Sequence, residues 1–387
     1  MAEHSEGAGP VAVYGATGYT GRLVAEELQR RGAEFVLAGR SAEKLEALAS
    51  ELASSPRTAA VSLDDAAALR ELLEPCAAVI ACAGPFTLHG EPLLAAAADT
   101  GTHYLDTTGE QAFLRMALDR YGERAARTSA IVVPAMGFDY VPGDMIAALL
   151  ADGMVPLDEL TLAYSVRGFG ASRGTMHSTL EIIRAQGVEY RDGALRQAPR
   201  SVDRGRWKFP APVGEQRVVR FPAGEQISVP RHVETRNVST LFSAATIIPS
   251  SRLAPAAPVL VPLMRLGMRT PLRRVGNAVI DRLPEGPDVE ARRASRFMIS
   301  CEARAGASRR RGTITGMDVY GLTAVTTVHG ALLAAARGYE ERGGLAPSQA
   351  FDPADFLGAL GEFGVDYEVE PVPEAARAAS PVQAQRE

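Results

Sequence analysis

Cysteine is scarce in this sequence. The three cysteines, Cys76, Cys82 and Cys301, are too few and too widely spaced for a disulfide framework. No CxxC pair is present either, so neither a structural zinc site nor another metal centre is expected. Both absences are typical of a reduced protein, and we expect a cytoplasmic location.

Long hydrophobic runs and a positive net charge are also missing. The N-terminus has no basic segment followed by an apolar one, so a secretory signal peptide is not expected. No apolar run reaches the ~18 residues of a membrane-spanning helix, and the nearest candidate, residues 253–268, contains three prolines and an arginine. The net charge of −5 gives no electrostatic reason to expect a nucleic-acid partner.

The length of 387 residues exceeds the size at which one hydrophobic core usually keeps growing, so two domains are expected. Over residues 1–150, short apolar runs alternate with segments that have apolar residues at helical spacing. The runs predicted to be strands are 11–15, 35–39, 58–63, 77–84, 103–109 and 130–137. This alternation predicts an α/β domain with a parallel sheet and helices on both faces.

The pattern changes near residue 158. Strands are predicted at 159–168, 216–224, 296–306 and 312–319, and the region 190–235 is interpreted as loops with edge strands. We therefore expect a second α+β domain, built on a mostly antiparallel sheet, over 151–320. A helix over 322–342 and a short strand at 367–371 form a C-terminal segment, 321–372. The tail 373–387 has little to bury and is expected to be disordered.

The stretch GATGYTG joins the first predicted strand to the first predicted helix. Gly15 permits the sharp turn out of the strand, Gly18 lets a diphosphate approach the backbone, and Gly21 allows tight packing of the helix on the sheet. The start of the helix directs unpaired N–H groups at an anion. We therefore predict a nucleotide site on Gly15, Ala16, Thr17, Gly18, Tyr19 and Thr20; a purely structural loop is the alternative.

The residues after the second strand indicate which nucleotide binds. An NAD site usually has an acidic residue there, which accepts a hydrogen bond from the ribose 2′-hydroxyl. This chain has Arg40, Ser41 and Lys44 instead, and Arg40 offers a planar cation for a 2′-phosphate. We therefore predict NADP(H) as the cofactor. The alternative is that Arg40 and Lys44 only decorate a solvent-exposed helix start.

Two further loops follow strands, at the edge where ligands bind in α/β sheets. They are ACAGPF (81–86) and DTTGE (106–110), and both are predicted to lie beside the cofactor. The alternative is that they only form tight turns and cap the following helices. We expect the second domain to cover this edge with segments 172–181 and 316–321, because hydride transfer needs a site shielded from water.

Several motifs together resemble the saccharopine dehydrogenase-like oxidoreductases, and among these the actinobacterial trans-acting enoyl reductase group most of all. They are VYGATGYTGRLVAEEL, LAGRSAEKLEAL, AGPFTLHGEPLLAAAADTGTHYLDTTGE, PAMGFDYVPGD and GMDVYGLTA. The likeness is strong over the first 150 residues, moderate over 310–365 and thin between 185 and 300. It implies a Rossmann domain, a second domain inserted before the chain returns to pack on the first, NADP(H), and hydride transfer between the two domains.

The resemblance also implies roles for individual residues. The turn residues would hold the diphosphate, and Arg40 and Lys44 the 2′-phosphate. The ribose and nicotinamide would be lined by Ala83, Gly84, Pro85 and Phe86, with Gly137, Phe138 and Asp139 near the nicotinamide. Saccharopine reductases bind a dicarboxylic amino acid with well-placed cations, and the middle region here has no matching set of arginines. That departure argues against amino-acid chemistry.

Reduction of an activated double bond requires a proton donor as well as a hydride. Candidate catalytic residues are Asp139 and Tyr140 in GFDYVPGD and His177 in SRGTMHSTLE. Tyr320 and His89 are further candidates. Asp139 could instead cap a helix that starts near Pro142, and His177 could be a structural histidine.

The segment 253–280 mixes Leu, Val and Met with four arginines and allows three interpretations. It could be an apolar lid over a hydrophobic substrate with a basic rim for an acidic carrier, a peripheral membrane contact, or a core helix with a solvated basic face. Our leading hypothesis is an NADPH-dependent enoyl (C=C) reductase acting on a hydrophobic acyl or polyketide-type substrate, either free or carrier-bound. The alternatives are an imine (C=N) reductase and a non-catalytic NADP-binding scaffold or lipid-surface protein; a homodimer stays open.

Overall fold

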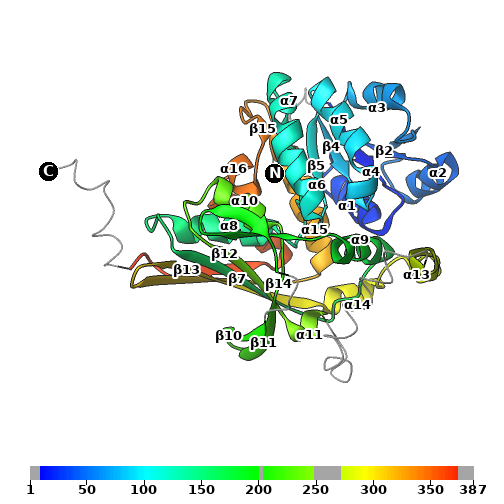
Figure 1. The fold of residues 1–387 in the computed structure, drawn as a ribbon. Helices are drawn as coiled ribbons and strands as arrows, with labels where there is room; N and C mark the ends of the chain where they lie inside the picture. The colour runs from blue at the N-terminus through cyan, green and yellow to red at the C-terminus, as the bar shows by residue number, and fades with distance from the viewer. Residues whose placement is uncertain (1–8, 200–203, 248–271, 374–387) are drawn as a thin grey trace.

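The computed structural model describes residues 9–199, 204–247 and 272–373. Within them the chain forms two sheets: seven parallel strands in a first domain and nine mostly antiparallel strands in a second (Figure 1). Both sheet types agree with the predicted fold class. The arrangement matters for function because the second domain lies against one edge of the first sheet.

All strands of the first sheet run parallel, in the order β3-β2-β1-β4-β5-β6-β15. They are β1 (Val11–Tyr14), β2 (Phe35–Gly39), β3 (Arg57–Ala60), β4 (Ala78–Ala81), β5 (His103–Asp106), β6 (Ile131–Val133) and β15 (Gly343–Gly344). The inner strands are short apolar runs because helices bury both of their faces. The order of the first six strands is that of the Rossmann fold.

Helices cover both faces of this sheet (Figure 1). In chain order they are α1 (Tyr19–Arg30), α2 (Ala42–Glu51), α3 (Ala66–Leu73), α4 (Phe86–His89), α5 (Glu91–Thr100), α6 (Gln111–Met116), the π-helix η1 (Ala117–Tyr121) and α7 (Gly122–Arg127). The hydrophobic residues of α1 and α2 share one cluster with the later helix α15 (Val319–Ala334). Those of α3, α5 and α7 form the cluster on the opposite face.

The second sheet has the order β10-β11-β12-β7-β13-β14-β16, and the hairpin of β8 and β9 adds to β12. Its strands are β7 (Glu159–Arg167), β8 (Val188–Arg191), β9 (Ala194–Gln197), β10 (Arg204–Lys208), β11 (Glu215–Arg220), β12 (Val238–Ser243), β13 (Arg296–Ala305), β14 (Ser308–Met317) and β16 (Asp366–Val369). Only the β12–β7 pair is parallel among the described strands of this sheet.

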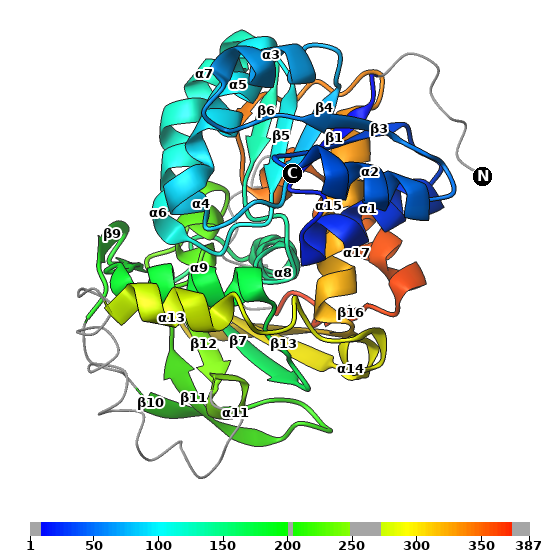
Figure 2. The ribbon, with the colours of Figure 1, turned by 90° about the vertical axis from the view of Figure 1, so that its right-hand side faces the viewer.

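Helices of the second part of the chain lie beside this sheet or between the two domains. They are α8 (Val141–Ala151), α9 (Arg173–Arg184), α10 (Glu225–Ser228), the 3-10 turn η2 (Val229–Arg231), α11 (Ala244–Ile247), α13 (Leu272–Ile280) and α14 (Val289–Ala294). The C-terminal part adds α16 (Pro347–Ala350), α17 (Pro353–Ala359) and the 3-10 turn η4 (Leu360–Phe363). Figure 2 shows α8 and α9 between the first domain and the second sheet.

One hydrophobic cluster joins the two domains. It contains Ile80 of β4, Ile146 of α8, Ile299 of β13 and Val328 of α15, all without solvent exposure. Helix α8 packs on β13 and β14, whereas α15 packs on α1, β4 and β5. The chain after the second sheet therefore returns to the first domain, and its last strand, β16, rejoins the second sheet.

The helix near the C-terminus is shorter than the sequence predicts. The helix predicted over 322–342 was wrong in extent, because α15 runs from Val319 to Ala334 and Gly338 then takes a φ of +85°, which no helix tolerates. Residues 253–271 of the arginine-containing segment, and 374–387 of the expected disordered tail, lie outside the described residues. Across the ranges that the structure describes, none of the helices combines the length and apolarity needed to cross a bilayer.

Candidate cofactor and hydride-transfer site

The GATGYTG turn has the shape that its glycines predict. Gly15 has a φ of +83° and donates from its N–H to Ala38 O of the neighbouring strand, at 2.9 Å. A Cβ at Gly15 would lie 3.0 Å from Ala83 N, and one at Gly21 would overlap the carbonyl oxygen of Gly15. Both positions therefore need glycine for the fold itself.

Gly18 differs from these two glycines. Its backbone is extended, and a Cβ there would meet only the Gly15 carbonyl oxygen, at 3.4 Å. Gly18 is exposed and stands directly before α1, whose first-turn N–H groups have no intrahelical partner. Packing within the fold therefore does not require glycine at position 18. The absence of a side chain there would allow a diphosphate to approach the backbone closely.

Two alanine substitutions separate folding from ligand binding at this turn. We expect Gly21→Ala to destabilise the protein by about 1–3 kcal/mol, because the new methyl group must displace backbone. Gly18→Ala is expected to fold normally and to lose about tenfold or more in NADPH affinity, since the methyl group occupies the anion's approach. Thermal unfolding and NADPH titration measure the two effects. Unchanged NADPH affinity in Gly18→Ala would contradict the diphosphate site.

The residues predicted to select NADP(H) lie at the end of β2. Ser41 caps α2 by accepting a hydrogen bond from Lys44 N, at 3.4 Å. Arg40 and Lys44 are exposed, and within the described part of the chain neither forms an ion pair. Two uncommitted cations therefore stand at the position where a 2′-phosphate is expected.

The loops after β4 and β5 meet at the same edge of the sheet and are joined by Glu110. Its Oε1 accepts from Phe86 N at 2.8 Å, and its Oε2 accepts from Thr87 N at 2.9 Å. Ser178 of α9 also donates to Oε1, at 2.9 Å. The segment 172–181 therefore approaches this edge, as predicted from the sequence.

The segment 316–321 also reaches the edge. The Tyr320 ring lies edge-to-face on Tyr19 of the glycine-rich turn, with 5.0 Å between the ring centres. The Tyr320 hydroxyl accepts from Ser172 N at the start of α9, at 2.8 Å. Tyr19 in turn donates to Pro287 O, at 2.8 Å. The side chain of Tyr19 thus joins the two domains, which leaves its backbone for the proposed diphosphate.

Aromatic residues predicted near the nicotinamide point into the interior. The Phe138 ring lies 4.6 Å from that of Phe297, centre to centre, and the Phe86 ring lies 5.5 Å from that of Phe113. The backbone before α8 is fixed by α15, because Phe138 N donates to Thr323 Oγ1 at 3.1 Å. Phe86, Gly137 and Phe138 can therefore face a cofactor mainly through their backbones.

Asp139 is the predicted catalytic residue with the most suitable surroundings. Its side chain is exposed to solvent, but many protein atoms lie close to the carboxyl. They desolvate the carboxyl and raise its pKa to about 6. A Cβ on Gly109 would lie 3.8 Å from both the Asp139 Oδ2 and the Ile182 Cδ1 of α9. The expectation that Asp139 caps the following helix was wrong, because Tyr140 is the N-cap of α8 and no side chain caps it.

The other candidate donors have structural partners. Tyr140 donates to Gly109 O at 2.9 Å and is buried, which raises the pKa of its hydroxyl. His177 Nε2 lies 3.0 Å from Asp281 Oδ1, on the side of α9 that faces α13. His89 is exposed on α4. The geometry thus favours Asp139 as the group that can give up a proton.

Sequence reasoning missed two acids behind Asp139. Glu225 of α10 is fully buried and accepts from the Tyr164 hydroxyl, and its Oε2 has no hydrogen-bond partner among the residues that the structure describes. Asp144 of α8 is also fully buried and pairs with His232 Nε2 at 3.0 Å. An acidic residue in a sequence normally indicates a solvent-exposed position, so neither burial could be read from the pattern.

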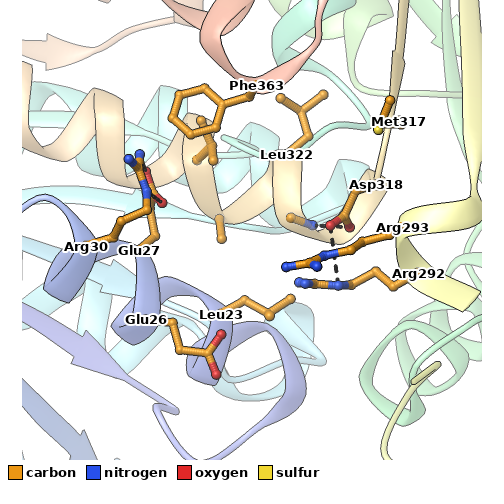
Figure 3. Close-up of a pocket in the computed structure, with 13 residues that line it drawn as sticks. Leu23, Glu26, Glu27, Arg30, Arg292, Arg293, Met317, Asp318, Leu322 and Phe363 are labelled. Carbon is orange, nitrogen blue, oxygen red and sulfur yellow. Dashed lines mark hydrogen bonds and ion pairs between the residues drawn. The ribbon is translucent and has the colours of Figure 1, made fainter. Parts of the chain in front are cut away.

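A cavity of about 300 Å³ lies elsewhere, between α1, α14, α15 and η4 (Figure 3). Four of its charged groups form two pairs: Arg30 binds Glu27 at 2.7 Å, and Arg292 lies 3.4 Å from Asp318. None of the residues predicted to bind cofactor or to act in catalysis lines it. We therefore place the candidate site at the sheet edge and not in this cavity.

Comparison with known proteins bears on the first domain. Residues 11–133 match the family model described as the saccharopine dehydrogenase NADP binding domain. The match is confined to the first domain of the chain. The glycine-rich turn, Arg40 and the loops after β4 and β5 all lie within it.

Two curated relatives come from mycobacteria. A Mycobacterium tuberculosis protein named provisionally as a trans-acting enoyl reductase is 40% identical over 186 residues, which cover 45% of this chain and 44% of that protein. The trans-acting enoyl reductase of Mycobacterium bovis is 39% identical over 140 residues, 35% of this chain and 34% of that protein. The matches thus span less than half the length of these relatives.

A solved structure has a similar overall fold. The saccharopine dehydrogenase (L-Glu forming) of Saccharomyces cerevisiae has a TM-score of 0.56, covering 94% of this chain and 100% of that chain. The identity of 14% shows a common fold alone. That fold is a Rossmann sheet joined to a second, mixed sheet.

Proposed function

We propose that this protein is an NADPH-dependent enoyl reductase that reduces a C=C bond in a hydrophobic acyl or polyketide-type substrate, which a carrier protein can present. One observation carries the proposal: the glycine-rich turn, the loops after β4 and β5, and Asp139 meet at one sheet edge beneath α9. The NADP-binding domain supports the cofactor, and the names of the mycobacterial relatives support the reaction.

Different residues of this chain would bind the cofactor and donate the proton. The backbone of Gly15–Thr20 would hold the diphosphate, and Arg40, Ser41 and Lys44 the 2′-phosphate. Ala83–Phe86 and the backbone of Gly137–Phe138 would line the ribose and nicotinamide. NADPH held at this site would supply the hydride for the β-carbon of the enoyl group, and Asp139 would give its carboxyl proton to the α-carbon. The double bond becomes a single bond, and Asp139 is left as a carboxylate.

Reduction assays with matched substrates test the reaction. We expect loss of NADPH absorbance with a long-chain enoyl thioester and a saturated product, faster on an acyl carrier protein than on a free thiol ester. An imine formed from an amino acid and a carbonyl compound is the rival substrate. Turnover of the imine alone would favour saccharopine-reductase chemistry. NADPH binding without oxidation of either substrate would favour a non-catalytic scaffold.

Cofactor choice is testable through Arg40. Charge-assisted hydrogen bonds contribute roughly 1.5–3 kcal/mol, so Arg40→Ala is expected to weaken NADPH binding about tenfold or more and to leave NADH binding nearly unchanged. Titration of both cofactors measures the effect, and Arg70→Ala, at another exposed arginine on α3, is the matched control. Equal affinity of the native protein for NADPH and NADH would contradict this assignment.

A further inference from the structure

Glu110 is a buried acid at the centre of the proposed cofactor site. Only 3% of its surface is exposed, and it stands directly before α6. Phe86 N, Thr87 N and the Ser178 hydroxyl all donate to its two oxygens, at 2.8–2.9 Å. A carboxyl that only accepts hydrogen bonds, from three donors, is in its ionised form.

Glu110 caps the start of α4, because it accepts from the first two backbone N–H groups of that helix, but no cation balances its negative charge within the described residues. In the part of the chain that the structure describes, no Lys, Arg or His forms an ion pair with it. Three neutral donors meet its two oxygens, so hydrogen bonds alone offset the desolvation cost of the buried charge. The charge itself therefore needs an explanation.

The position of Glu110 supplies that explanation. The two N–H groups it binds follow directly after Ala83–Pro85, the loop proposed to line the nicotinamide. The Ser178 hydroxyl, its third donor, lies 3.3 Å from where a Cβ on Gly84 would be. The negative charge of Glu110 also acts on Asp106, at the end of β5. Burial is the larger cause and the charge of Glu110 a smaller one, and together they raise the pKa of Asp106 to about 7.

We propose that Glu110 is an electrostatic positioning residue that favours the positively charged, oxidised nicotinamide ring over the neutral, reduced one. The inference rests on the proposed function. Transfer of a hydride, which is a proton with two electrons, to the substrate would leave the nicotinamide ring with one positive charge. A fixed carboxylate in a water-poor site stabilises that charge as it develops, without any rearrangement.

Separate titrations with NADP⁺ and NADPH test the proposal without any substrate. We expect Glu110→Gln to weaken NADP⁺ binding about tenfold and to change NADPH binding less than about twofold. A tenfold change in this ratio corresponds to a shift of about 30 mV in the midpoint potential of the bound two-electron couple. A purely structural role would weaken both redox states equally, and that result would overturn the proposal.

Two variants of Ser178 control for damage to the loop. Ser178→Ala removes one hydrogen bond and keeps the charge, so the ratio of the two affinities should stay that of the wild type. Ser178→Lys keeps the hydrogen bonds from Phe86 N and Thr87 N to Glu110 and places a cation beside its carboxylate. It should therefore shift the ratio of NADP⁺ to NADPH affinity as Glu110→Gln does. This test holds even where Glu110→Gln folds poorly. An unchanged ratio in Ser178→Lys would refute the proposal. If the wild-type protein binds neither redox state, the proposed function itself fails.

Discussion

Replacing Asp139 with asparagine is expected to lower the rate of substrate reduction about 10²- to 10⁴-fold, the usual contribution of a general acid. The change keeps the size of the side chain and removes its transferable proton. NADPH affinity should stay within about twofold of wild type, because the proposed contacts to the cofactor come from other residues. Single-turnover rates and NADPH titration give the two quantities.

The pH dependence gives a second signature of the same residue. Desolvation by the surrounding protein raises the pKa of the exposed Asp139 side chain to about 6, so its proton is present below this pH and is lost above it. The wild-type rate should therefore fall as pH rises through about 6, and Asp139→Asn should lack this limb. Tyr140→Phe is the neighbouring control, because the Tyr140 hydroxyl is held by backbone groups, including Gly109 O, and the rate of this variant should change little. If His177→Gln abolished the limb and Asp139→Asn did not, the donor would be His177.

The architecture of the first domain was readable from the sequence because its signals are local. Strands such as VAVY and AVIA are short apolar runs. In a parallel sheet that helices cover on both faces, every residue of an inner strand is buried, so an apolar run marks the whole strand. The glycine-rich turn was readable for the same reason, since Gly15 and Gly21 each meet a demand of the adjacent backbone. By contrast, β15 consists of Gly343 and Gly344, and two glycines carry no hydrophobic pattern.

The site was only partly readable because its geometry depends on contacts between distant residues. Glu110 lies in a loop that the sequence flagged, but its partner Ser178 is 68 residues away on α9. The sequence indicated His177 as a candidate and not the adjacent Ser178. The orientation of α9 decides which of these two side chains faces the first domain, and the sequence does not show that orientation. The pairing of Asp144 with His232, 88 residues apart, has no local signal at all.

Glu225 predicts an unusual dependence of stability on pH. This fully buried carboxyl accepts one hydrogen bond from Tyr164 and forms no ion pair within the described residues. Burial, opposed by the Tyr164 hydrogen bond and reinforced by Asp144 and Asp139, raises its pKa to about 8. Its carboxyl is therefore neutral in the native protein at neutral pH, whereas in the unfolded chain it ionises near the ordinary value of 4.5.

The sign of the effect follows from proton binding. Between about pH 4.5 and 8 the native state holds one proton more than the unfolded state at this residue, so the free energy of unfolding falls as pH rises. At about 1.4 kcal/mol per pH unit, the full interval corresponds to a loss of roughly 5 kcal/mol. Glu225→Gln replaces the neutral acid with a neutral amide of equal size, so this contribution should vanish and the variant should be the more stable protein at pH 8.

Urea unfolding of both proteins from pH 3 to 8 measures this difference, and Asp144 supplies a control with the opposite sign. Its pairing with His232 and its hydrogen bonds with Ser348 lower the pKa of Asp144 despite burial, so its contribution is present at neutral pH and is lost only as pH falls below about 4. Asp144→Asn should therefore destabilise the protein at pH 7, by about 3–5 kcal/mol, because it leaves His232 without its buried partner. Parallel stability curves for wild type and Glu225→Gln would show that Glu225 is ionised in the native state.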